Sequence, residues 1–227
     1  MIPDDLERLK SRLPPLLSAV AGMVDVIGYL NLKMFTAHVT GNLVIIASLL
    51  VRGGPPNPDQ VLAVPFFILA VGGVWFCSKA LQRRGPALAK PLLYLQFLLL
   101  VCVLIVAVTR HPVANPRGLT ADIAAMIAVS AMACQFALFR LAVPGAPSTA
   151  VMTGNITAAV LSLLDTLSLG EPLIAGAEEQ LKRTAYLLIG FFAGCLAGAA
   201  GFSWWGEWAW TLPVTLTGLT LAFVPGA

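Results

Sequence analysis

The stretch Phe35-Thr-Ala-His-Val-Thr-Gly-Asn-Leu-Val-Ile-Ile-Ala-Ser-Leu-Leu-Val51 places the tripeptide Thr40-Gly41-Asn42 at the start of a short apolar run. A second copy, Thr153-Gly154-Asn155, opens another short apolar run that extends to Leu169. A transmembrane helix needs roughly 20 apolar residues, so neither run is long enough to cross a bilayer. A small polar tripeptide in front of such a run predicts a half-helix whose unpaired N–H groups lie at membrane depth.

The composition indicates a membrane protein. Of the 227 residues, 58% are hydrophobic and only 11% are charged, whereas a soluble domain has roughly 25% charged residues. The length suits one transmembrane domain, residues 1–227, and the net charge of +3 argues against a nucleic-acid partner. The charged N-terminal segment has no signal-peptide pattern, and we interpret it as a retained cytoplasmic arm.

Apolar segments follow the order long, break, short, long, long, and this order occurs twice. The first repeat covers about 13–109 and the second about 119–224, which predicts an internal duplication. Pro14-Pro15 suits the start of the first spanning helix, because the N-terminal N–H groups of a helix are unpaired in any case. The six segments of membrane length are Leu13–Leu32, Val61–Leu81, Pro91–Thr109, Leu119–Leu141, Lys182–Trp204 and Trp208–Val224.

The distribution of basic residues decides whether the short runs cross the membrane. If both are re-entrant and the N-terminus is cytoplasmic, ten Lys and Arg residues lie inside and four outside, as the positive-inside rule requires. The predicted fold is therefore an all-α polytopic membrane protein with six transmembrane helices and both termini cytoplasmic. Each half has three crossings, so the halves form two inverted three-helix repeats, each with a re-entrant or broken half-helix.

Asp25 and Gln135 occupy matching places on the helices that precede the two breaks. Polar side chains within a membrane normally face a polar interior, and we favour this interpretation for both residues. The alternative is that each one hydrogen-bonds to the broken backbone nearby and only holds the half-helix in place.

The residue types of the repeated tripeptide suggest a solute site. Asn42 and Asn155 are candidates to cap the half-helices through their side-chain oxygens, and Gly41 and Gly154 to permit an unusual turn and close approach of a solute. Thr40 and Thr153 offer hydroxyls, and the positive helix ends favour an anion or a carbonyl oxygen. His38 is either a gate or pH sensor, or an ordinary loop histidine.

Other features are better explained by structure than by chemistry. The series Gly190, Gly194, Gly198, with the shorter Gly72-Gly73, predicts close helix packing within the chain first and a homodimer contact second. Trp204, Trp205, Trp208 and Trp210 suggest an interfacial aromatic belt. The four cysteines fall in apolar runs far from either histidine, and enzyme motifs are absent, so we predict no metal, no cofactor and no enzymatic activity.

The run Phe35-Thr36-Ala37-His38-Val39-Thr40-Gly41-Asn42, the upstream Asp25 and Gln135, and the second Thr-Gly-Asn resemble the YoaK-like family of small bacterial inner-membrane proteins. The resemblance covers nearly the whole chain. It implies a multi-pass protein of the bacterial inner membrane, and it implies no activity, because that family is uncharacterised.

The function that we favour is a channel or secondary transporter for a small solute, either an anion or a polar neutral molecule, in the lipid bilayer. We expect its site to lie between the N-termini of the two Thr-Gly-Asn half-helices. Asp25 is a candidate proton-coupling group, which would make the protein a carrier. A non-transport accessory or lipid-interacting protein is the alternative, with the glycine-rich helix and the Trp cluster as partner surfaces. An intramembrane enzyme is the least supported of the three.

Overall fold

Every regular element in the described part of the chain is helical. The structure is a computed structural model, and it describes residues 3–53, 57–80, 85–116, 118–168 and 173–224. The α-helices are α1 (Pro3–Leu32), α2 (Thr40–Arg52), α3 (Pro58–Ala80), α4 (Ala89–Arg110), α5 (Leu119–Leu141), α6 (Met152–Leu167), α7 (Ala177–Trp205) and α8 (Thr211–Phe223). Short 3-10 turns are η1 (Gly85–Leu88), η2 (Pro112–Ala114) and η3 (Gly206–Trp210).

Five stretches of the described chain are long and apolar enough to cross a membrane, which makes this a helical membrane protein. They are Leu9–Leu32, Pro58–Ala80, Ala89–Arg110, Leu119–Leu141 and the continuous run Ala177–Phe223. The last stretch contains the two segments that we predicted as separate spans. It folds back at η3, where Gly206 has a positive φ of 56°, and its second limb α8 has only 13 residues. A sixth full-length span is therefore not established.

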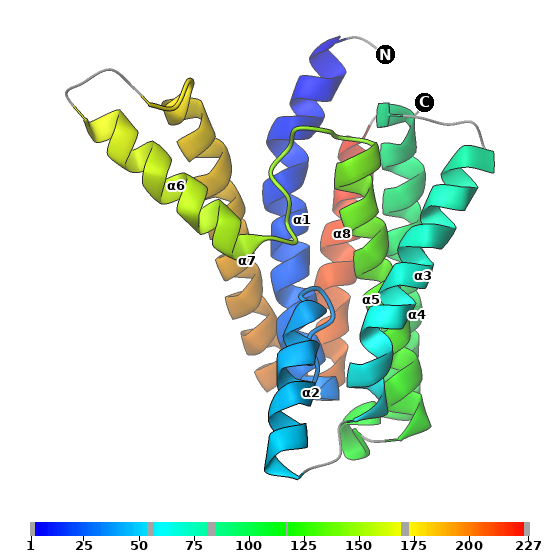
Figure 1. The fold of residues 1–227 in the computed structure, drawn as a ribbon. Coiled ribbons are helices and arrows are strands. Elements are labelled where there is room, and N and C mark those ends of the chain that lie inside the picture. The colour runs from blue at the N-terminus through cyan, green and yellow to red at the C-terminus, as the bar shows by residue number, and fades with distance from the viewer. Residues whose placement is uncertain (1–2, 54–56, 81–84, 117, 169–172, 225–227) are drawn as a thin grey trace.

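The two short helices lie where the sequence predicts them, and Figure 1 shows how they are oriented. Both α2 and α6 begin at mid-height in the molecule. The helix α2 runs toward the lower end of the view, and α6 runs toward the upper end, where α1 begins and α8 ends. Neither helix is packed on all sides, because α2 contacts mainly α3 and α6 contacts mainly α7.

The contact between α1 and α7 is the most extensive in the fold, and glycines create it. A Cβ atom on Gly190 would lie 2.4 Å from the carbonyl oxygen of Pro15, and one on Gly194 only 2.1 Å from that of Ala19. From α1, a Cβ on Gly22 would lie 2.3 Å from the carbonyl oxygen of Phe191. The two backbones therefore touch, which maximises van der Waals contact in a lipid environment.

The glycine series thus works within the chain, as the sequence suggested. A homodimer through Gly190, Gly194 and Gly198 stays a prediction that a single chain does not test, although α1 already occupies the surface beside them. The matching pair Gly72 and Gly73 differs, because a Cβ on either one would meet no atom within 4 Å. The expected packing role of that pair is wrong in the isolated chain.

Two further expectations about helices and aromatic residues need correction. The first helix begins at Pro3 and continues through Pro14 and Pro15, because the polar N-terminal segment is helical too. Trp210 is fully buried in the core, since η3 turns it inward against α4 and α1. Trp204, Trp205 and Trp208 are exposed, as an interfacial belt requires.

Candidate functional site

The first break is organised around the carboxylate of Asp25. Its Oδ1 accepts hydrogen bonds from three successive backbone N–H groups, those of Thr36 at 2.9 Å, Ala37 at 2.7 Å and His38 at 3.2 Å. Its Oδ2 contacts Nδ1 of His38, and the side chain of Asp25 is buried. The second interpretation therefore describes Asp25 better, because its carboxylate satisfies N–H groups of the break that are largely buried.

The second break is organised around Gln135, which is fully buried. Its Nε2 donates to the carbonyl oxygen of Leu17 at 2.9 Å and to the hydroxyl of Thr149 at 3.0 Å. Its Oε1 accepts from Nε2 of Gln96 at 2.7 Å. Gln135 thus connects its own break to α1 and α4, so it also acts first as a structural residue rather than as part of an open polar lining.

The asparagines of the two tripeptides make the same contact in both halves. Nδ2 of Asn42 donates to the carbonyl oxygen of Phe35, and Nδ2 of Asn155 donates to that of Ser148, each at 2.8 Å and each seven residues upstream. Oδ1 of Asn42 also accepts from the N–H of Phe35 at 2.9 Å. The predicted helix-capping role is wrong, because both asparagines lie inside the first turn of their helix and bond back to the break.

The unusual turn predicted for the two glycines is also wrong, whereas the close approach of a solute to them stays a prediction. Neither Gly41 nor Gly154 has a positive φ, since each already belongs to a helix. Glycine is required at both positions because there is little room for a side chain. A Cβ on Gly41 would lie 2.9 Å from the ring of Phe35, and one on Gly154 would lie 3.0 Å from the side chain of Val151. Both glycines let the break fold tightly against the start of its half-helix.

Thr40, Thr153 and Gly154 are exposed, in contrast to the buried asparagines beside them. No side-chain cap satisfies the first N–H groups of α2 or α6. Backbone carbonyl oxygens take their place in part, because the N–H groups of Gly41, Asn42 and Asn155 donate to His38, Val39 and Val151. Each half-helix thus presents an exposed threonine beside the positive end of the helix at mid-height, an arrangement that attracts an anion or a carbonyl oxygen. His38, in the preceding break, is partly exposed as well.

His38 links this open region to the buried carboxylate. Its ring is partly exposed and meets the ring of Phe191 edge-on, with the ring centroids 5.4 Å apart. Nδ1 contacts Asp25, whereas Nε2 is buried and has no hydrogen-bond partner among the described residues. The structure does not bring His38 into contact with Gln135, which belongs to the other break.

The sequence reasoning missed several polar residues. Gln96 and Thr149 complete the network of Gln135, and a polar residue within the apolar run of α4 was the signal for the first. The second histidine, His111, pairs through Nδ1 with Glu207 at 2.6 Å, and the other oxygen of Glu207 accepts from the N–H of Val113 at 3.0 Å. This pair holds η2 against η3 at the lower end of the molecule.

We expect Asn42→Ala to lower the free energy of unfolding by about 2 kcal/mol, because the N–H and C=O of Phe35 would both lose their partner. Thermal unfolding of the detergent-purified protein measures this loss. Thr40→Val is the matched control two residues away, and it should change stability by less than about 0.5 kcal/mol because that side chain is exposed. Equal effects of the two variants would contradict the pairing.

Comparison with known proteins gives one match. A model of the family described as protein of unknown function (DUF1275) matches residues 13–223, which include both breaks and both half-helices. No curated protein and no solved structure matches the chain. Within the described residues, no group of three or more His, Cys, Asp or Glu side chains is placed to hold a metal ion.

Proposed function

The chain belongs to the DUF1275 family, whose function is unknown, and we propose that it is a membrane channel or secondary transporter for a small solute. The observation that carries this proposal is the pair of half-helices that begin at mid-height and run toward opposite ends. Irregular backbone at membrane depth is tolerated only where protein or a water-filled path surrounds it. Two such ends, each with an exposed threonine, are the natural place for a solute site.

Helix packing supports an inverted duplication. The helix α1 packs along α7, and the corresponding helix of the second half, α5, packs along α3. Likewise α2 lies on α3 as α6 lies on α7, and α4 contacts α5 as α8 contacts α1. Exchanging the two halves thus reproduces the same set of contacts, which is the arrangement of transporters built from inverted-topology repeats.

The chemistry of the half-helix ends favours a small anion or a polar neutral solute. Each N-terminus carries about half a positive charge, and no basic side chain lies within either tripeptide. Thr40 and Thr153 can donate or accept a hydrogen bond. In this proposal, Asp25 and Gln135 act as positioning residues that hold the two ends in place, and His38 can respond to protonation at the edge of the site.

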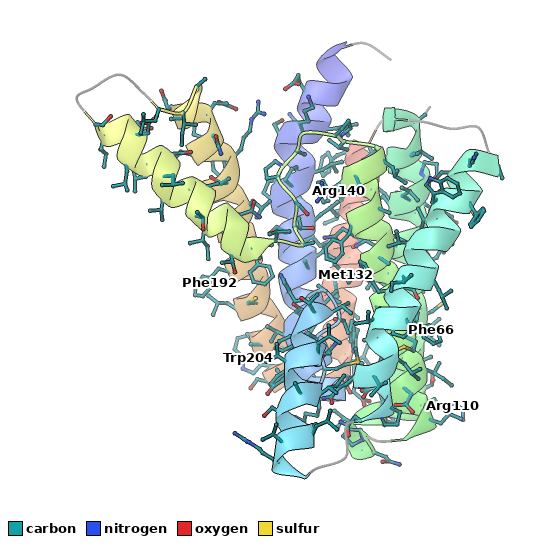
Figure 2. All side chains as sticks on the ribbon, in the orientation of Figure 1. Phe66, Arg110, Met132, Arg140, Phe192 and Trp204 are labelled. Carbon is teal, nitrogen blue, oxygen red and sulfur yellow. The ribbon has the colours of Figure 1, made fainter. Side chains whose placement is uncertain are left out.

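We further propose that the protein is a multi-pass protein of the bacterial inner membrane with both termini in the cytoplasm. Figure 2 shows Arg140 near the end where α1 begins and Arg110 at the opposite end. Lys10 and Lys182 belong to the same end as Arg140, so the more basic end would face the cytoplasm. The resemblance to the YoaK-like family supports this location and remains a prediction.

Flux into proteoliposomes tests the transport function. We expect protein-dependent uptake of at least one member of a panel of small anions and neutral solutes (formate, nitrate, chloride, urea, glycerol). The double variant Thr40→Val, Thr153→Val should reduce that uptake at least tenfold, because each hydroxyl provides roughly 1 kcal/mol in hydrogen bonding. Thr166→Val, at the far end of α6, is the control that should leave uptake unchanged, since its hydroxyl bonds within its own helix.

A membrane accessory or lipid-interacting role is the second candidate, and one observation favours it. The short helix α2 exposes apolar side chains along most of its length, among them Leu43, Val44, Leu50 and Val51. These would lie against lipid or a partner helix. Absence of uptake across the whole panel, together with specific co-purification of another membrane protein, would support this role over transport.

A further inference from the structure

Three polar side chains at the lower end of the molecule have buried atoms that no other described group satisfies. Asn31 is fully buried, and neither Oδ1 nor Nδ2 has a hydrogen-bond partner. Asp59 is fully buried, and while its Oδ1 accepts from the N–H of Gln60 at 2.8 Å, its Oδ2 has no partner. Oδ1 of Asp122 is also buried without one. Unsatisfied buried groups of this kind are rare and destabilising.

Helix register brings Asn31 and Asp122 to the same level. The helices α1 and α5 run in opposite directions, and Gln135 of α5 bonds to the carbonyl oxygen of Leu17. Asn31 lies fourteen residues after Leu17, and fourteen residues before Gln135 is Ala121, the neighbour of Asp122. Because both helices rise 1.5 Å per residue, Asn31 and Asp122 lie at matching heights.

Asp59 belongs to the same region. It lies in the first turn of α3, which packs along α5, the helix that carries Asp122 in its own first turn. The next residue, Gln60, donates from Nε2 to the carbonyl oxygen of Lys33 at 3.0 Å, which fastens the start of α3 to the end of α1. The end of α1 and the starts of α3 and α5 therefore lie at the same end of the molecule, and each carries one of these three side chains.

The local charge is not balanced by protein groups. Asp59 and Asp122 carry two negative charges when ionised, and each lies at a helix N-terminus that contributes about half a positive charge. About one negative charge remains. Among the described residues neither aspartate forms an ion pair, and the nearby Lys33 donates its Nζ to the carbonyl oxygen of Leu30 instead.

We propose that Asn31, Asp59 and Asp122 form a binding site for one small monovalent cation of the sodium class. Carboxylate and amide oxygens are the ligands that hard cations prefer, and one unit charge matches the residual charge of the site. A single proton shared by the two aspartates would need their oxygens within hydrogen-bond distance, and neither free oxygen has a partner within that distance. The site is independent of the proposed solute path, which lies at mid-height.

Helix-dipole stabilisation alone is the competing explanation, since acidic residues are common in the first turn of a helix. The acidic residues in the first turn of α7 are different, however. Glu178 and Glu179 at the start of α7 are exposed and pair with Lys182 at 2.6 Å and Arg183 at 2.9 Å. The two aspartates are distinguished by their buried, unsatisfied oxygens and by the buried amide between helices.

Thermal unfolding of the detergent-purified full chain tests this site, with NaCl replaced by choline chloride at constant ionic strength. We expect Na⁺ at about a hundredfold excess over its Kd to raise the Tm by roughly 5 °C or more. Asp122→Asn, which keeps the shape and removes the charge, should abolish the Na⁺-dependent rise. Glu178→Gln, an acidic residue in a first turn with a basic partner, should keep it.

If the Asp122 variant does not fold, measurements on the wild-type protein alone still test the cation site. A Tm that responds to Na⁺ and not to choline, at pH 6 and at pH 8, supports the site. A Tm that changes with pH and not with Na⁺ overturns it, because the aspartates would then simply be protonated. An equal response of wild type and a folded Asp122→Asn protein to Na⁺ also overturns it. None of these results depends on whether the protein transports a solute.

Discussion

Replacing Gly194 with leucine is expected to lower the free energy of unfolding by about 3 kcal/mol or more and to leave little monodisperse protein after purification. A Cβ atom at this position would lie 2.1 Å from the carbonyl oxygen of Ala19 and 2.8 Å from its Cα. The helices α1 and α7 would have to separate, and their contact is the most extensive in the fold. Thermal unfolding and size-exclusion chromatography in detergent measure the effect.

Two controls test whether the clash at Gly194 is with the main chain of α1. Ala19→Gly should not rescue Gly194→Leu, because the obstructing atoms belong to the main chain of α1 and not to a side chain. Gly73→Ala, a glycine-to-alanine change in another spanning helix, should be neutral or slightly stabilising, since a Cβ there meets nothing within 4 Å and alanine favours the helix. If Gly194→Leu were tolerated as well as Gly73→Ala, the α1–α7 contact described here would be wrong.

Asp25→Ala is the second change for which we expect a large loss of stability, about 3 kcal/mol or more. It leaves the N–H groups of Thr36, Ala37 and His38 without an acceptor in a buried position, and an unsatisfied buried donor destabilises by roughly 1–3 kcal/mol. Asp25→Asn keeps an oxygen where Oδ1 accepts these bonds, so it should destabilise much less. The difference in Tm between the two variants isolates the role of the oxygen acceptor.

The same two variants show whether Asp25 only positions the break or also couples transport to protons. If Asp25 only positions the break, Asp25→Asn should retain most of the solute uptake of the wild type and its dependence on pH. If uptake by the folded Asn variant falls at least tenfold and no longer responds to a proton gradient, the carboxylate itself takes part in transport. This measurement applies only after uptake by the wild type has been found.

The sequence was sufficient to predict the repeated break and half-helix. The short lengths of the runs after Thr40-Gly41-Asn42 and Thr153-Gly154-Asn155 predict that neither crosses the membrane fully, and that argument needs only the rise of a helix and the thickness of a bilayer. The sixth span predicted at the C-terminal end is not established, because the α-helix there, α8, has only 13 residues and is shorter than the apolar segment that contains it.

The roles of individual site residues were less predictable. Asn42 suggested a cap, because asparagine caps helices more often than it bonds seven residues upstream. Asp25 suggested a polar lining, because the sequence does not show that three N–H groups of a later segment converge on it. Trp210 resembled its exposed neighbours until the turn at η3 placed it in the core.

By itself, the sequence determined that this is a membrane protein, that its chain is mostly helical, and that two short helices follow two breaks. These properties depend on hydropathy and spacing along the chain, which neighbouring residues fix locally. Only the tertiary structure decided which backbone faces Gly194, which groups Asp25 satisfies, and that Asn31, Asp59 and Asp122 have buried polar atoms without a partner among the described residues. Such partners are far apart in sequence, and a buried polar atom acquires its partner only when the helices that carry the two groups pack together.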